Sequence, residues 1–131
     1  MNDIAVLLSH PAATIAVVGA TDNPTKYGSV IYQDLKNKGY RVFPVNPGRD
    51  TVAGDQAYPD VASLPEPPTI VDFVVPPDVT LRVLTQCLEA DLMNVWVQPG
   101  AESPEVIRYI QEHGFSYLTN ACIMVHTRAV S

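Results

Sequence analysis

The residues best suited to chemistry lie in a polar loop bounded by glycines, VVGATDNPTKYGSV at 17–30. Gly19 ends a hydrophobic run, and Gly28 stands in the first turn of a predicted helix. A dinucleotide-binding fingerprint needs the spacing G-x-G-x-x-G, but Thr21 and Pro24 occupy its second and third glycine positions here. The fingerprint therefore fails, and the loop has to be interpreted from the donors that it offers.

The start of the predicted helix is a candidate anion site, because free backbone N–H groups and the positive end of the helix dipole meet there. Thr21 and Asn23 add side-chain hydrogen-bond donors, and Lys26 adds a positive charge. The alternative is that Thr21 and Asp22 only cap a turn, while Lys26 is a solvated surface residue. We favour phosphate binding because the loop directly follows a buried strand.

A second candidate contact follows the hydrophobic run at 40–46. The segment consists of Asn46, Pro47, Gly48 and Arg49. Sites for NAD usually carry an acidic residue here, whereas an amide followed by an arginine suits a ribose that bears a phosphate. This pattern points to NADP or to coenzyme A (CoA), whose ribose carries a 3′-phosphate. The alternative is a surface loop in which Arg49 is solvated or paired with Asp50 or Asp55.

No catalytic constellation is predicted. The histidines are His10, His113 and His126. None of them falls at a strand end beside a nucleophile, and no Cys/His spacing fits zinc. Cys122 follows the last hydrophobic run, but an isolated cysteine in ACIMV is more typical of packing than of reactivity. A dehydrogenase would also need a substrate domain, for which 131 residues leave no room. A binding module is favoured over an enzyme.

The elements that must position these residues are visible as hydrophobic runs and helical periodicities. Runs rich in Val, Ile and aromatic residues predict strands buried on both faces, at 14–20, 40–46, 69–75, 93–98 and 115–120. Apolar residues at helical spacing predict helices at 26–38, 77–90 and 103–113. Ser103 is the predicted N-cap of the last helix, and Gly39 and Gly114 are predicted to end the first and the last. The stretch 55–64 is expected to hold a short helical turn.

This alternation predicts an α/β fold with three layers, α/β/α. We expect a Rossmann-like, doubly wound, parallel five-stranded sheet in the order 3-2-1-4-5. A ligand then binds beyond the carboxyl ends of the strands, at the switch point between the first and fourth strands. Pro44 conflicts with this order because proline removes a ladder hydrogen bond from an internal strand. We expect a local bulge or a shifted strand boundary there.

Length and composition indicate one globular domain over 1–131, with 47% hydrophobic and 17% charged residues. The net charge of −6 argues against non-specific binding to nucleic acid or to an anionic membrane. The N-terminal MNDIAVLLSHP has no basic region and only a short apolar run, so neither a signal peptide nor a membrane span is predicted. Two cysteines are too few for a disulfide framework, and we expect a cytoplasmic protein.

Motifs in these segments together resemble the small stand-alone CoA-binding domain proteins. This family is related to the N-terminal CoA-binding domain of the succinyl-CoA synthetase alpha subunit. The motifs are IAVVGATDNPTKYG, GYRVFPVNPG, DFVVPP, VWVQPGAES and NACIMV. The resemblance spans 12–126 and implies a Rossmann-like fold that binds CoA across the strand ends.

The resemblance also implies which residues contact the cofactor. The loop after the first strand supplies Gly19, Ala20, Thr21, Asp22 and Asn23. The turn after the second strand supplies Pro47, Gly48 and Arg49. Val75 and Pro76 follow the third strand and are expected against the adenine or the pantetheine arm. The segment after the fourth strand matches Val97, Gln98 and Pro99. The candidate cofactor-binding set is completed by Lys26, Tyr27, Gly28, Asn46 and Gly100.

The family's thioester synthesis is not expected here, because the phosphorylated histidine of the synthetase belongs to a second domain that this sequence does not contain. We assign no role to His126. The sequence is interpreted as a non-catalytic protein that binds CoA or acyl-CoA, with the pyrophosphate at the start of the first crossover helix. Neither nucleic acid nor a membrane is an expected partner, and a homodimer or another protein partner stays open.

Three alternatives remain open at this point. The first is an NADP-binding small oxidoreductase or regulatory module. The second is an interaction subunit with a vestigial nucleotide pocket. The third is a thiol-handling protein in which Cys122 forms a mixed disulfide with CoA.

Overall fold

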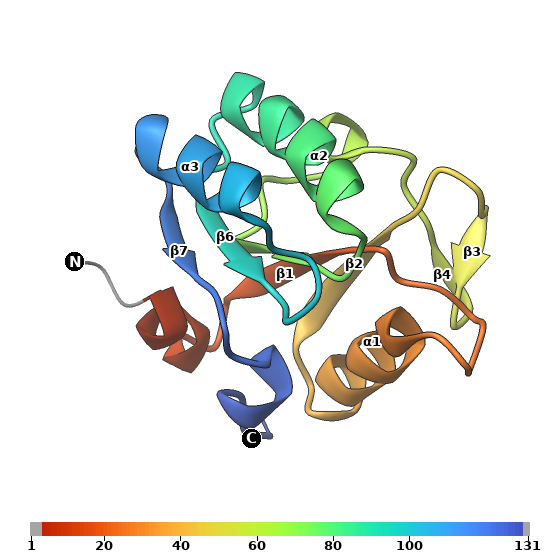
Figure 1. The fold of residues 1–131 in the computed structure, drawn as a ribbon. Coiled ribbons are helices and arrows are strands. Elements are labelled where there is room, and N and C mark those ends of the chain that lie inside the picture. The colour runs from red at the N-terminus through yellow and green to blue at the C-terminus, as the bar shows by residue number, and fades with distance from the viewer. Residues whose placement is uncertain (1–3, 130–131) are drawn as a thin grey trace.

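The computed structural model describes residues 4–129 (Figure 1). Its main sheet has five parallel strands in the order β2-β1-β5-β6-β7. These strands are β1 (Thr14–Val18), β2 (Arg41–Val45), β5 (Ile70–Phe73), β6 (Asn94–Val97) and β7 (Ser116–Leu118). Helix α1 (Tyr27–Asn37) covers one face, and α2 (Pro77–Glu89) and α3 (Pro104–Glu112) cover the other (Figure 1). The three-layer, doubly wound Rossmann-like class is confirmed.

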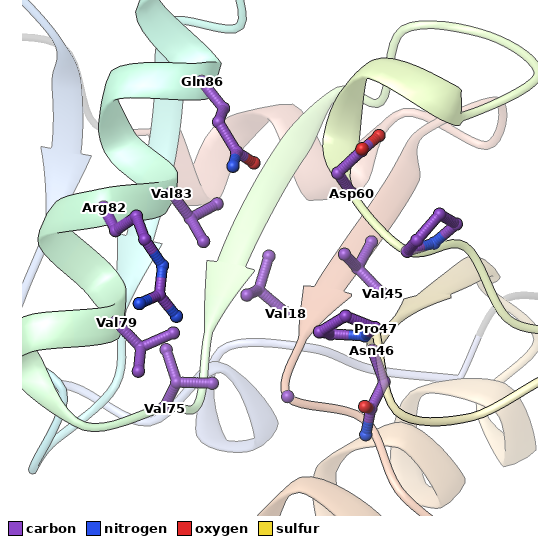
Figure 2. A pocket seen from close by; sticks show the side chains of 12 residues that line it. Val18, Val45, Asn46, Pro47, Asp60, Val75, Val79, Arg82, Val83 and Gln86 are labelled. Atoms are coloured by element: carbon purple, nitrogen blue, oxygen red, sulfur yellow. The ribbon is translucent and has the colours of Figure 1, made fainter.

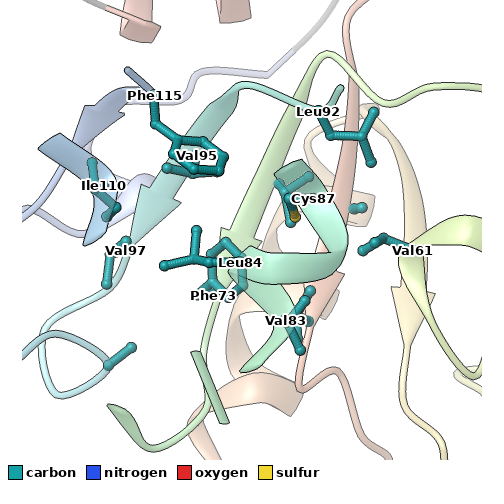
Figure 3. Close-up of a cluster of buried hydrophobic side chains, with 14 of the residues drawn as sticks. Val61, Phe73, Val83, Leu84, Cys87, Leu92, Val95, Val97, Ile110 and Phe115 are labelled. Carbon is teal, nitrogen blue, oxygen red and sulfur yellow. The ribbon is translucent and has the colours of Figure 1, made fainter. Parts of the chain in front are cut away.

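Successive side chains of a strand point to opposite faces of the sheet, and this alternation produces two hydrophobic clusters. Ala16 and Val18 of β1 join the cluster under α2 and α3, which Figure 3 shows around Leu84. Ile15 and Val17 join the cluster under α1. All of β1 is buried, as expected for a strand covered by helices on both faces.

The order of the strands corrects the expected neighbour of β2. Residues 69–75 were expected to lie outside β2, but β5 pairs with the other side of β1. The outer side of β2 carries a single parallel bridge between Val45 and Tyr58. If the Tyr58 bridge is counted as the third strand in chain order, the sheet has the 3-2-1-4-5 style of arrangement. The segment 69–75 is then the fourth strand, next to β1, and not the third.

Pro44 supplies a physical reason for this arrangement. It stays within β2, opposite Val17, and neither a bulge nor a shifted boundary is needed. Its carbonyl accepts a hydrogen bond from the Tyr58 N–H at 2.9 Å. The N and C=O of one strand residue point to the same side, so the nitrogen of Pro44 also faces the outer edge. Because it carries no hydrogen, it cannot extend the outer pairing, but the ladder to β1 is intact.

The helix ends agree with the sequence. The Ser103 hydroxyl accepts a hydrogen bond from the Val106 N–H at 3.1 Å, as an N-cap should. Gly39 and Gly114 follow α1 and α3 with positive φ values of 94° and 75°. Their left-handed backbone explains why glycine occupies these positions.

Smaller elements complete the described fold. A short 3₁₀ turn, η2 (Val61–Ser63), is the helical turn expected within 55–64. The strand pair β3 (Thr51–Val52) and β4 (Asp55–Gln56) and the 3₁₀ turns η1 (Ile4–Ser9) and η3 (Ile123–Val125) were not predicted. Within residues 4–129, no helix is long and apolar enough to cross a membrane.

Candidate functional site

The candidate site lies at the carboxyl ends of β1 and β5. The chain leaves β1 for the face of α1 and leaves β5 for the face of α2, so the sheet switches direction between these two strands (Figure 1). This corrects the expected location beside 93–98, because β5 occupies the place next to β1. Such a switch point leaves an open crevice between the loops that follow the two strands.

Two cavities fill this crevice and share the wall formed by Gly19, Asn46 and Val75. The first, called here the apolar cavity, holds about 440 Å³. Its other lining residues are Val18, Val45, Pro47, Pro59, Asp60, Val79, Arg82, Val83 and Gln86. The second, called here the polar cavity, holds about 410 Å³. Its other lining residues are Thr21, Asn23, Lys26, Tyr27, Gly28, Arg49, Val74 and Pro76.

Gly19 and Gly28 set the shape of the polar cavity. Gly19 has a φ of +105°, and a Cβ on it would lie 2.8 Å from both Val74 O and Val75 Cγ1. A Cβ on Gly28 would lie 2.1 Å from the carbonyl oxygen of Gly19. The first turn of α1 therefore rests on the backbone that ends β1. This contact explains the two glycines, although their spacing does not match a dinucleotide fingerprint.

The start of α1 can accept an anion. Lys26 is its N-cap residue and makes no side-chain capping hydrogen bond. The first N–H groups of a helix have no acceptor within the helix, and the helix dipole leaves a positive partial charge there. The Lys26 side chain lines the same cavity. A phosphate group is the natural complement of this arrangement.

The loop between β1 and α1 is held by its own side chains. Thr21 Oγ1 accepts a hydrogen bond from the Asn23 N–H at 3.2 Å. Asn23 Oδ1 accepts from both the N–H and the hydroxyl of Thr25, at 3.1 and 2.7 Å. Asp22 does not cap this turn; its carboxylate accepts from the Ala53 N–H at 2.7 Å. The amide NH₂ of Asn23 has no protein acceptor within residues 4–129, so it is free to donate into the cavity.

Arg49 lies at the edge of the polar cavity in a weak ion pair. Its Nη1 is 3.7 Å from Asp22 Oδ2, and the two side chains are 37% and 45% exposed. The partners considered from the sequence, Asp50 and Asp55, are not used. Asp55 instead accepts from the Tyr32 hydroxyl at 2.6 Å and pairs with Lys36 at 2.9 Å. The Tyr32 hydrogen bond, followed by Lys36, lowers the pKa of Asp55.

Asn46 joins the two loops that carry these groups. Its Nδ2 donates to the carbonyl of Ala20 at 2.9 Å, and its Oδ1 accepts from the Gly48 N–H at 2.9 Å. The amide therefore fixes the loop after β2 against the loop after β1. An acidic side chain at this position could not make the donated hydrogen bond.

The apolar cavity brings together residues that the sequence did not single out. Figure 2 shows Val79, Arg82 and Val83 of α2 on one side and Val45 and Asp60 on the other, with Val18 between them. The available signal was helical spacing: positions 79, 82, 83 and 86 fall on one face of a helix that starts directly after a strand end. Periodicity assigns the valines of that face to the core and gives no role to their polar neighbours Arg82 and Gln86.

Seven of the predicted contact residues line neither cavity: Ala20, Asp22, Gly48, Val97, Gln98, Pro99 and Gly100. Ala20 and Val97 are buried in the core, and Gln98 is 1% exposed. Pro99 and Gly100 form a turn after β6. The part of all seven residues in cofactor binding stays a prediction. Among residues 4–129, no three His, Cys, Asp or Glu side chains gather as a metal site.

Comparison with known proteins places this geometry in context. Residues 13–128 match the model of a family described as a CoA binding domain. The uncharacterized protein YneT of Bacillus subtilis is 29% identical over 111 residues, which cover 85% of this chain and 82% of YneT. The alpha subunit of ADP-forming acetate–CoA ligase II of Pyrococcus furiosus is 27% identical over 120 residues. That match covers 83% of this chain and 26% of the ligase subunit.

Solved structures give the same picture. A conserved hypothetical protein of Pyrococcus furiosus superimposes with a TM-score of 0.85 and 45% identity, over 88% of this chain and 99% of its own. The dinucleotide-forming acetyl-coenzyme A synthetase 1 of Ca. Korarchaeum cryptofilum, solved with phosphate and ADP, gives a TM-score of 0.73 at 30% identity. That alignment covers 99% of this chain and 31% of the synthetase chain. The chain thus matches whole small proteins and a part of longer ligases.

Proposed function

Because this chain belongs to the CoA-binding domain family, we propose that it is a non-catalytic protein that binds CoA or an acyl-CoA. The ligand lies across the carboxyl ends of β1 and β5, with its pyrophosphate at the start of α1. The observation that carries this proposal is the junction of the two cavities at Gly19. One cavity offers anion-binding groups and the other offers an apolar wall, which are the two environments that a nucleotide needs.

The polar cavity suits the pyrophosphate. Asn23, Lys26 and the first two residues of α1, Tyr27 and Gly28, all line one space. Gly19 and Gly28 carry no side chain, so a phosphate can approach the backbone closely there. The adenine belongs in the apolar cavity, between the α2 valines and Val45.

Arg49 is the proposed ligand of the ribose 3′-phosphate. Its ion pair with Asp22 is long and exposed, and such pairs contribute about 0–1 kcal/mol. A phosphate can therefore replace Asp22 as its partner at small cost. Arg82, which lines the apolar cavity and has no ion-pair partner within residues 4–129, is a second guanidinium within the cleft.

NADP is the second candidate ligand, and one observation favours it. The loop after β2 has no acidic clamp for the ribose hydroxyls, and Arg49 matches a 2′-phosphate as well as a 3′-phosphate. NADP and CoA differ in the position of the ribose phosphate and in the group attached to the far side of the pyrophosphate. A direct comparison of the two ligands separates them.

Isothermal titration of the full chain with CoA, dephospho-CoA and NADP tests the proposal. We expect CoA to bind most tightly and dephospho-CoA to bind more weakly, because it lacks the 3′-phosphate. Arg49→Ala should lose about 1.5–3 kcal/mol of CoA affinity, the range for a hydrogen bond to a charged group. It should also lose the preference for CoA over dephospho-CoA. Arg108→Ala, on α3 and away from both cavities, is the matched control.

Each result has a definite meaning. Stronger binding of NADP than of CoA would overturn the CoA proposal. Equal affinity of the wild type for CoA and dephospho-CoA would keep CoA as ligand and remove Arg49 from the site. Heat from none of the three would favour an interaction protein with a vestigial pocket.

A further inference from the structure

The two cysteines lie in opposite surroundings. Cys87, a residue of α2, is wholly buried, and this burial raises the pKa of its thiol to about 12. Cys122 is partly exposed and stands just before η3. A buried cysteine of the first kind is inert, whereas thiol chemistry needs access and polar partners. Cys122 has both.

Two polar side chains hold the sulfur of Cys122. The Gln98 amide donates from Nε2 to Cys122 Sγ at 3.3 Å, and its Oε1 accepts from the Ile123 N–H at 3.0 Å. The Tyr27 hydroxyl lies 3.1 Å from the same sulfur. The contact with Cys122 is the main reason that the pKa of Tyr27 rises to about 12. Tyr27 therefore keeps its proton and can donate a hydrogen bond to a thiolate, which is the attacking form of cysteine.

Asp72 is an independent sign that this region is more than packing. Its side chain is wholly buried, and neither carboxyl oxygen has a hydrogen-bond partner within residues 4–129. Asp72 pairs in register with Trp96, so it shares the sheet face of Trp96 and of Gln98 two residues further on. The Trp96 indole donates to Ala121 O at 2.9 Å, which places the Cys122 turn over that face. Asp72 is thus aimed at the surroundings of the sulfur.

The electrostatics agree with this placement. Burial, followed by the nearby Cys122, raises the pKa of Asp72 well above its usual range. An unpaired buried carboxyl group destabilises a fold, and such groups gather at functional sites. A hydrophobic side chain of similar size would not destabilise the fold in this way, so the stability of the fold does not explain an aspartate at position 72.

The sulfur contacts a side chain that also lines the polar cavity. Tyr27 lines that cavity, and its hydroxyl is the group in contact with Cys122. The chain around η3 packs against α1, as Figure 1 shows at the C-terminal end. A CoA molecule with its pyrophosphate at the start of α1 carries its thiol on the flexible pantetheine arm beyond those phosphates. The pantetheine arm can then bring the CoA thiol close to the thiol of Cys122.

We propose that Cys122 attaches this ligand covalently and reversibly, as a mixed disulfide with the CoA thiol; the inference rests on the proposed function. The oxidant is the disulfide form of the ligand. The Cys122 thiolate attacks one sulfur of CoA disulfide, the S–S bond of CoA disulfide breaks, and a Cys122–S–S–CoA bond forms. The second CoA leaves as a thiolate and takes up the proton that Cys122 lost. A small thiol reverses the step by the same exchange.

The test treats the reduced full chain with CoA disulfide after the reductant has been removed. Intact mass and peptide mapping follow the adduct, and release of CoA thiol gives the rate. We expect one CoA per chain, attached to Cys122. Cys122→Ser should abolish the adduct, while Cys87→Ser, the matched control, should keep it.

Two probes show whether the cleft directs the reaction. Oxidised glutathione carries the same reactive S–S bond without the nucleotide. Its rate should be lower by a factor on the order of ten or more, because binding of the nucleotide brings the reacting sulfurs together. Adenosine 3′,5′-bisphosphate carries the nucleotide part without the thiol. In excess, it should lower the rate with CoA disulfide to the rate with oxidised glutathione.

The absence of an adduct on Cys122 would overturn the inference, and so would equal rates with both disulfides. A second experiment tests the proposed function separately from the covalent step. It titrates the wild type and Cys122→Ser with reduced CoA in the presence of a reductant, so that only reversible binding is measured. Reversible binding without an adduct refutes only the covalent step. Absence of reversible binding refutes the proposed function whatever happens at the thiol.

Discussion

The carboxyl group of Asp72 lies between Val17 of β1 and Trp96 of β6, without a hydrogen-bond partner within the described chain. Its two neighbours in register are apolar, so the folded state disfavours its charged form. The pKa of Asp72 is therefore raised, first by burial and then by Cys122. A single residue in this state gives the whole fold a pH dependence, because folding and protonation are linked.

Asp72→Asn should remove this pH dependence. In the unfolded chain the carboxyl titrates near its ordinary pKa of about 3.9, while the folded state holds the proton to a higher pH. The stabilising effect of that proton is fully present below the unfolded pKa and is lost as the pH rises toward the folded pKa. Urea unfolding at a series of pH values should show the wild type losing stability relative to Asp72→Asn as the pH rises.

Asp50→Asn is the control for this series, because Asp50 is an exposed aspartate in the same chain. It should leave the pH profile of the wild type unchanged. Parallel profiles for Asp72→Asn and the wild type would show that Asp72 does not take up a proton on folding.

At the scale of elements, the contact between α1 and β1 determines the cleft. Gly28 brings the helix start onto the backbone of Gly19, and Gly19, with its positive φ, leaves no room for a side chain beside Val74 and Val75. The start of α1, where the helix dipole is positive, then lines the polar cavity. The site depends on the close approach of these two elements as much as on the side chains around it.

Gly28→Ala should separate these elements. The new Cβ would lie 2.1 Å from Gly19 O, a backbone atom that cannot rotate away, so α1 has to shift. We expect a loss of about 1–3 kcal/mol in the free energy of unfolding, as for other overpacking changes. Weaker CoA binding should accompany it because the anion site moves with the helix. Denaturant unfolding and isothermal titration measure the two effects.

Gly48→Ala is the stability control for this change. Its Cβ would meet only Asn46 Oδ1, at 3.4 Å, which is ordinary contact. Its unfolding free energy should stay close to that of the wild type. A Gly28→Ala protein with wild-type stability would contradict the packing argument.

At the scale of the whole molecule, the cleft lies between parts that are far apart in the chain. Its walls come from the loops after β1, β2 and β5, from the start of α1, from Pro59 and Asp60, and from α2. A ligand that touches all of them binds the folded chain and has no equivalent site in the unfolded chain. Ligand binding should therefore stabilise the fold as a unit.

Thermal unfolding measures this coupling. A ligand at a hundred times its Kd adds about 2.7 kcal/mol, which corresponds to a rise in Tm of roughly 10 °C for a domain of this size. We expect this rise with CoA and a smaller one with dephospho-CoA at the same concentration. An unchanged Tm with saturating CoA would contradict binding in an interior cleft.

Much of the architecture was predictable because its causes are local. Continuous runs of Val and Ile mark strands buried on both faces, and Ser103 and Gly114 mark the ends of α3 through their own backbone preferences. The loop proposed to bind an anion was likewise recognisable in the sequence, since it consists of consecutive residues between one strand and one helix. These features need no knowledge of which strand lies beside which.

The sequence by itself thus determined the α/β class, the helix limits and the loop proposed to face the ligand. Only the tertiary structure decided that β5 lies beside β1 and that Pro44 limits the outer edge. It also decided that Arg82 reaches the cleft and that Cys122 meets a tyrosine 95 residues earlier in the chain. The physical reason is that hydrophobic periodicity indicates which face of an element is buried, but it does not indicate which other element packs against that face. Contacts between distant segments depend on the choice among crossovers, which all bury the same faces.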